Sequence, residues 1–114
     1  METEFDINKR IQMPPAREIL SRLKSSAKKR GIYFDLTISD ILAIDFPITC
    51  PILNVPMGWY RGMARDESYS VDKIDSSLGY TFDNLQIISA KANRAKNNLT
   101  EEELQNFASF INNS

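Results

Sequence analysis

The chain has 114 residues, of which 42% are hydrophobic and 25% charged, a composition that is ordinary for a soluble globular protein. No apolar run approaches the roughly 18 residues that a membrane span needs, and the acidic, polar N-terminus predicts no signal peptide. One cysteine, Cys50, excludes a disulfide within the chain and fits a reducing compartment, so we expect a cytoplasmic protein without membrane contact.

Charge is unevenly distributed along the sequence. The net charge of −1 argues against a protein that binds DNA through bulk charge, but residues 16–30 carry six basic residues and one acid, Glu18. Residues 84–100 carry only basic charges, at Lys91, Arg94 and Lys96. Such segregation permits a basic face on a nearly neutral protein, and the alternative is two ordinary solvated helix faces.

The first part of the chain predicts a helix. We expect residues 1–13 to be flexible and residues 14–114 to form a single domain. Pro14 and Pro15 suit the first turn of a helix, where a backbone N–H has no helical partner. Apolar residues at helical spacing follow, and Gly31 can end this helix.

The next elements are short. Residues 31–37 predict an extended segment, and Thr37 or Ser39 can cap a second helix over residues 38–45 that ends before Pro47. Three prolines and two glycines then predict a long loop with short strands.

A strand, a turn, a second strand and a helix follow in order. Residues 69–74 alternate well enough for a strand, with Ile74 among its apolar residues. Residues 75–84 predict a turn, residues 85–89 another strand and residues 90–98 a helix.

The C-terminal segment predicts a last helix. Thr100 and Glu103 have the spacing of a capping box, and the acids suit the positive start of a helix. The apolar residues that should dock on the core are Leu104, Phe107, Ala108 and Ile111. We therefore expect a small α+β domain with a ββα core over residues 69–98, flanked by N-terminal and C-terminal helices.

Residues 69–98 read YSVDKIDSSLGYTFDNLQIISAKANRAKNN. This stretch resembles the HNH, or His-Me finger, endonucleases, and especially the branch of recombination endonuclease VII and the small phage HNH proteins. The matching positions, in order, are Ser70, Asp72, Lys73, Ile74, Asp75, Gly79, Tyr80, Asn84, Ser89, Ala92, Asn93, Arg94 and Lys96. The resemblance covers about half the chain, residues 49–98, and implies a ββα unit that grips a metal ion and cuts phosphodiesters.

That branch also carries a structural zinc ion on two CxxC pairs, and here the frame is largely lost. Cys50 stands at the first cysteine position, whereas Leu53, Ser89 and Ala92 stand at the other three. One thiol is too little for tetrahedral zinc, so we expect no structural zinc and a buried Cys50 that acts as a small hydrophobe. The core that should replace the zinc consists of Leu53, Ile87, Ile88 and Ala92.

The resemblance implies a metal site for Mg²⁺ or Mn²⁺. Asp72 matches the first ligand and Asn93 the second, and both side chains offer the hard oxygen donors that such ions prefer. Asn84 matches an asparagine that pins the loop, and the alternative is an ordinary turn residue. Asp75 matches a further ligand, but we favour the alternative of an aspartate that opens the turn.

Lys73 stands at the place of the family's general-base histidine, and the chain contains no histidine. Lysine, with a pKa near 10.4, stays protonated unless it is strongly desolvated, and the neighbouring Asp72 and Asp75 favour the charged form. Such a cation cannot activate water, although it can hold a phosphate or stabilise developing negative charge. Tyr69 and Tyr80 would face the same difficulty as replacement bases.

Basic residues next to the motif predict a nucleic-acid surface, because cations of this kind contact the phosphate backbone. The predicted contacts are Lys91, Arg94 and Lys96 on the finger helix, and Arg61 and Arg65 in the preceding loop. Trp59 belongs either to this surface or to the core, which is the commoner place for a single tryptophan.

Three functions stay open from the sequence. The leading one is a phage-type HNH-like protein that binds nucleic acid, with DNA as the expected partner, and that could act as a metal-dependent endonuclease or nickase without the usual histidine base; the sequence does not decide between DNA and RNA. The alternative is a catalytically inactive HNH-fold module that binds DNA or a host protein. A weaker third hypothesis is a structural subunit of a larger nucleic-acid machine.

Overall fold

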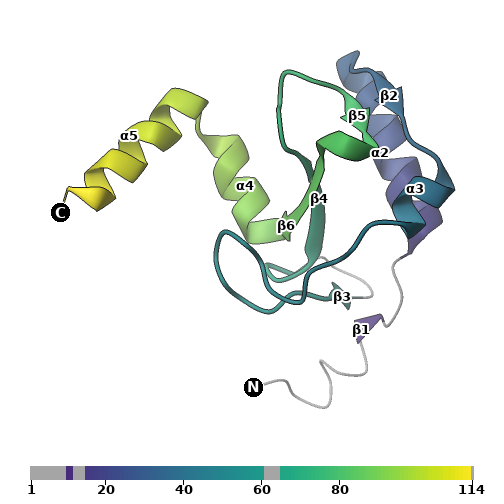
Figure 1. The fold of residues 1–114 in the computed structure, drawn as a ribbon, viewed down its shortest axis with the longest axis horizontal. Helices are drawn as coiled ribbons and strands as arrows, with labels where there is room; N and C mark the ends of the chain where they lie inside the picture. Colours follow the sequence, from purple (N-terminus) through teal and green to yellow (C-terminus); the bar gives the residue numbers. More distant parts are fainter. Residues whose placement is uncertain (1–9, 12–14, 61–64, 114) are drawn as a thin grey trace.

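The computed structural model describes residues 10–11, 15–60 and 65–113, which form a mixed α+β fold (Figure 1). In chain order the elements are β1 (Arg10–Ile11), α2 (Ala16–Arg30), β2 (Phe34–Asp35), α3 (Ile38–Leu42), β3 (Trp59–Tyr60), β4 (Tyr69–Lys73), β5 (Tyr80–Thr81), the 3-10 helix η1 (Phe82–Asn84), β6 (Leu85–Ser89), α4 (Ala90–Asn98) and α5 (Glu101–Asn112). Within these residues the strands pair as β1 with β3, β2 with β5 and β4 with β6. The predicted α+β class with a ββα core between flanking helices is confirmed.

The ββα unit consists of β4, β6 and α4. The two strands are antiparallel and pair over the full length of both. α4 begins directly after β6 because Ser89, its N-cap, accepts a hydrogen bond from the Ala92 N–H. The expected strand over residues 85–89 and the expected helix over residues 90–98 are confirmed. β4 ends at Lys73, however, and Ile74 lies outside the strand with 58% of its surface exposed.

The first two predicted helices both form. α2 follows Pro15 and ends at Gly31, whose φ of 65° is the left-handed conformation that glycine adopts without strain. α3 begins at a capping box between Thr37 and Asp40. It is shorter than predicted, because it ends at Leu42.

The segment after α3 explains this early end. Ile44 and Phe46 alternate with the exposed Asp45, and both pack against the two clusters of the core. Burying two apolar side chains outweighs one further helical turn. Trp59 is half-buried, and its ring lies 5.1 Å from that of Phe46 and 4.9 Å from that of Tyr69, as the core alternative predicted.

The core has two adjoining clusters. One consists of Ile19, Ala27, Leu36, Ile41 and Tyr80, and the other of Cys50, Met57, Ile87, Ile88 and Ala92. The second cluster is the core that we expected in place of zinc, and Cys50 is buried in it as predicted. Leu53 is the exception, with 39% of its surface exposed, and Met57 fills the cluster in its place. The backbone N–H of Leu53 lies 3.5 Å from the Cys50 Sγ in a tight turn, which leaves the leucine side chain outside.

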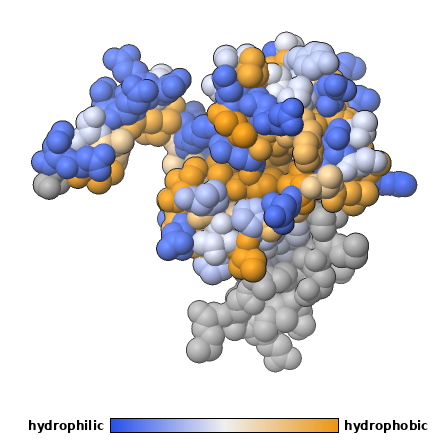
Figure 2. Space-filling view, viewed as in Figure 1, coloured by the Kyte–Doolittle hydropathy of each residue, from blue (hydrophilic) through white to orange (hydrophobic). Residues whose placement is uncertain are grey.

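α5 extends away from the rest of the fold (Figure 1). Its capping box between Thr100 and Glu103 forms as predicted. The predicted docking of its apolar face is wrong, because no residue of α5 is buried, and Phe107 and Ile111 are 57% and 59% exposed. Leu99 and Thr100, both extended, separate α5 from α4 and direct it outward. Figure 2 shows hydrophobic colour along the inner edge of α5 and hydrophilic colour along its outer edge.

Of the N-terminal segment that we expected to be flexible, only Arg10–Ile11 is described. It forms β1 and pairs antiparallel with β3. The rest of that prediction lies outside the described residues. Among the helices of the described ranges, none is long and apolar enough to cross a membrane.

Candidate functional site

One face of β4 meets one face of α4, and the candidate site lies where they meet. Side chains alternate along a strand, so Ser70 and Asp72 share a face of β4. Residues three and four apart share a face of a helix, which places Asn93, Lys96 and Asn97 together on α4. Hydrogen bonds between these two sets connect the strand to the helix.

Asp72 is held by two partners. Gln86, its neighbour on β6, donates from Nε2 to the Asp72 Oδ2 at 2.9 Å. The Lys96 Nζ lies 2.5 Å from the same oxygen and donates to the Lys73 carbonyl at 3.1 Å. The side chains of Asp72 and Lys96 are 13% and 28% exposed, so this ion pair is largely shielded from water.

Asn93 is also held through both ends of its amide. Its Nδ2 donates to the Ser70 Oγ at 2.7 Å, and its Oδ1 accepts from the Asn97 Nδ2 at 3.0 Å. Because Ser70 is two residues before Asp72 on β4, the two predicted metal ligands lie on the same strand–helix interface. Each of them contacts a polar side chain of the facing element.

The Lys73 side chain is not part of this strand–helix interface and lies inside the turn that follows β4. Only 6% of its surface is exposed, and its Nζ donates to the carbonyls of Ser76 and Leu78 at 3.1 and 3.2 Å. The ammonium group also lies 5.3 Å from the centre of the Tyr80 ring. Burial, aided by the positive charge of Arg30, lowers the pKa of Lys73 against the opposing effect of the nearby carboxylates. We expected those carboxylates to favour the charged form, but burial has the larger effect.

The turn after β4 is pinned by Asn84, which is 7% exposed. Its Oδ1 accepts from the Asp75 N–H at 2.9 Å, and its Nδ2 donates to the carbonyls of Asp75 and Gly79 at 3.1 and 2.9 Å. Asp75 accepts from the backbone and the hydroxyl of Ser77, and these bonds lower the pKa of its carboxyl group. A side chain at Gly79 would meet the Tyr33 carbonyl oxygen at 2.5 Å, so the turn requires glycine there.

The predicted nucleic-acid residues fall into different surroundings. Lys91 is exposed, Arg94 is 58% exposed and forms an ion pair with Asp66, and Lys96 is engaged with Asp72. The guanidinium of Arg65 lies 4.6 Å from the centre of the Tyr60 ring. Arg61 lies outside the described residues. Acids therefore offset part of the charge of α4.

Sequence reasoning gave no site role to the partners that complete the site, although Ser70 was among the positions that match the motif. Ser70, Gln86 and Asn97 hold Asp72 and Asn93, and the period of two along a strand and the spacing of four along a helix would have pointed to Ser70 and Asn97. A groove of about 610 Å³ adjoins the cluster, bounded by Lys96, the turn after β4 and the start of α5. Of the residues in the cluster, Lys96 lines this groove, and Asp72 and Asn93 do not.

At the position of the family's first zinc cysteine, backbone N–H groups surround the Cys50 thiol. The Sγ accepts from the Leu53 N–H at 3.5 Å and from the Ser89 N–H at 3.4 Å. Burial raises the pKa of the thiol, but hydrogen bonds from Ser89, Leu53 and Ile52 outweigh it and lower the pKa to about 7. Within the part of the chain that the structure describes, no group of three or more acidic, cysteine or histidine side chains could hold a metal ion.

Comparisons with protein-family models, curated proteins and solved structures each found no match. The resemblance to HNH endonucleases therefore stays a prediction from the sequence motif.

Proposed function

We propose that this protein is an HNH-like protein that binds nucleic acid, DNA in particular, without general-base catalysis. The observation that carries this proposal is the direction of Lys73, whose ammonium group donates to the Ser76 and Leu78 carbonyls inside the turn. The residue at the histidine position thus stabilises the turn, whereas Asp72 contacts Gln86 and Lys96. Lys73 therefore offers no general base to a substrate.

Nucleic-acid binding is supported by the order of β4, β6 and α4 and by the cations on α4. Lys91 and Arg94 are exposed on this helix. The Asp66 partner of Arg94 is itself 58% exposed, and exposed ion pairs contribute only about 0–1 kcal/mol. A backbone phosphate can therefore replace Asp66 at little cost.

A second candidate function is metal-dependent nicking, favoured by the common strand–helix interface of Asp72 and Asn93. Their carboxylate and amide oxygens are suitable donors, and Mg²⁺ or Mn²⁺ between them would supply positive charge for a scissile phosphate. The Lys96 ammonium group lies 2.5 Å from the Asp72 Oδ2, so binding of the ion requires Lys96 to leave. Asn93 would likewise give up its bond from Asn97.

Fluorescence anisotropy with a short labelled DNA duplex tests the first proposal. We expect binding at low salt that weakens steeply as salt rises, because phosphate contacts release counterions. Absence of binding at low salt would overturn nucleic-acid binding and direct the search to a protein partner.

Incubation of supercoiled plasmid with Mg²⁺ and then Mn²⁺ tests the second candidate. Nicking that disappears in Asp72→Ala and Asn93→Ala, but persists in Asp83→Ala, would support the metal site. Asp83 is a matched control because it is an exposed acid on η1. Nicking that survives both site substitutions would refute the assignment, and no nicking with either ion would leave DNA binding as the function.

A further inference from the structure

The outer face of α2 is a second concentration of positive charge. All six basic residues of this helix are exposed, and Glu18 is its one acid. The chain as a whole has a net charge of −1, and three glutamates gather in the first turn of α5. Charge separated in this way gives local potentials that the net charge conceals.

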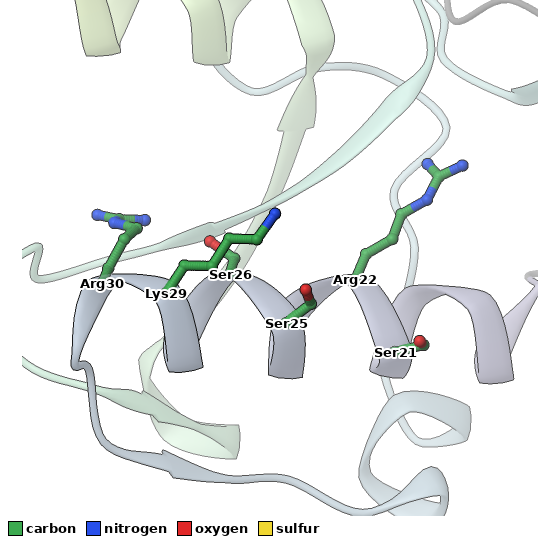
Figure 3. A pocket seen from close by; sticks show the side chains of 6 residues that line it. All are labelled: Ser21, Arg22, Ser25, Ser26, Lys29 and Arg30. Atoms are coloured by element: carbon green, nitrogen blue, oxygen red, sulfur yellow. The ribbon is translucent and has the colours of Figure 1, made fainter.

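The basic residues divide into two rows, and one of them lines a hollow. At 100° per residue, Arg22 and Lys29 lie together and Arg30, in the last turn of the helix, lies about 80° round from Arg22, whereas Arg17, Lys24 and Lys28 lie together on the other side of the solvent face. The hollow has a volume of about 470 Å³, and hydroxyl groups lie between its cations. Its lining consists of Ser21, Arg22, Ser25, Ser26, Lys29 and Arg30. Figure 3 shows Arg22, Lys29 and Arg30 directed to the same side of the helix.

Packing fixes this face toward solvent. Ile19 and Ala27 are buried on the opposite side of α2 and anchor the helix in the core. Among the described residues, the row forms one ion pair, which joins Arg22 to Glu18 at 2.5 Å, and both side chains are more than half exposed, at 77% and 55%. Such a pair contributes little, so Arg22 can turn to an anion.

The row also reaches toward the candidate site. Arg30 is the last residue of α2 and lines the hollow. Tyr33, which follows α2, accepts a backbone hydrogen bond from Tyr80 at the end of the turn. The C-terminal end of α2 is thereby attached to the turn of the ββα unit.

We propose that the hollow on α2, formed around Arg22, Lys29 and Arg30, binds backbone phosphates of DNA and supplies phosphate contacts in addition to those of α4. This inference rests on the proposed function. Arginine guanidinium groups, a lysine ammonium group and serine hydroxyls all donate hydrogen bonds that phosphate oxygens can accept. The apolar side of α2 is committed to the core, so this helix has no face to insert into a lipid surface.

Two triple variants of the full chain test the inference. Arg22→Ala/Lys29→Ala/Arg30→Ala removes the row that lines the hollow. Arg17→Ala/Lys24→Ala/Lys28→Ala removes the same charge from the same exposed helix and serves as the matched control. Circular dichroism checks the folding of both, and Lys91→Ala/Arg94→Ala reports separately on α4.

We expect the hollow variant to bind a labelled duplex at least tenfold more weakly at low salt. Its slope of log affinity against log salt should fall by up to about 2.7, because each lost phosphate contact removes about 0.9. The control should change affinity by less than threefold. Equal losses in both triple variants would overturn the inference, since bulk charge would then suffice.

Two other outcomes separate the alternatives. If the α4 variant loses binding and the hollow variant does not, the proposed function stands and this inference fails. If the unmodified chain does not bind DNA, both fail. Vesicles of phosphatidylserine and phosphatidylcholine form the last arm: vesicle binding that only the hollow variant loses, with DNA binding unchanged, would assign the face to lipid and overturn the inference.

Discussion

The turn that follows β4 depends on Asn84, and the substitution Asn84→Ala isolates its contribution. The side chain makes three hydrogen bonds to the backbone of the turn, at 2.9, 3.1 and 2.9 Å. Each such bond contributes about 1 kcal/mol net, so their sum is about 3 kcal/mol. Water can reach the freed groups of the exposed Asp75, and we therefore expect a loss of about 2–4 kcal/mol in the free energy of unfolding.

Urea denaturation followed by circular dichroism measures this loss, since a domain of this size is expected to unfold in a two-state transition. Asn97→Ala is the matched control, because it removes one bond from an exposed helical residue. Its loss should stay below about 1 kcal/mol, offset by the higher helix propensity of alanine. Asn84→Asp should lose at least as much as Asn84→Ala, because its carboxylate would face two carbonyl oxygens.

Equal losses in Asn84→Ala and Asn97→Ala would refute the reasoning. So would a loss below about 1 kcal/mol in Asn84→Ala, since the three bonds cannot then hold the turn. If Asn84→Ala loses the expected free energy of unfolding while its DNA binding is unchanged, the turn stabilises the fold without contacting DNA.

Two further predictions concern charge. Lys96→Met should bind Mn²⁺ at Asp72 at least about tenfold more tightly than the unmodified chain, because a charged hydrogen bond worth about 1.5–3 kcal/mol no longer has to break. Paramagnetic broadening of the Asp72 and Asn93 amide resonances measures this, with Lys91→Met as control; identical broadening in both variants would contradict it. The folded pKa of Cys50, about 7, lies below its ordinary value of 9.0, so the unfolded chain holds the proton at pH values between the two. Stability relative to Cys50→Ala should therefore rise between about pH 6 and pH 9, by at most about 2–3 kcal/mol, and be lost as pH falls through 7. If the urea midpoints of the unmodified chain and of Cys50→Ala changed with pH in the same way across this range, that expectation would be contradicted.

Local signals in the sequence determined much of the fold. Gly31 ends α2, Thr100 and Glu103 cap α5, and the apolar run of β6 passes directly into α4, as predicted. These predictions are confirmed because the cause of each feature lies within a few residues: a left-handed φ, a capping hydrogen bond or the period of side chains along an element. The order of strand, turn, strand and helix follows from them.

Tertiary structure alone decided where the charged and apolar side chains lie and what they contact. The sequence does not reveal that Lys73 enters the turn to meet the Ser76 and Leu78 carbonyls, or that Lys96 pairs with Asp72 twenty-four residues away. α5 has an amphipathic sequence, yet its extended connection turns it away from the core. Propensity and spacing specify an element and its faces, whereas the partner of a face depends on the path of the chain between elements, which long-range packing selects.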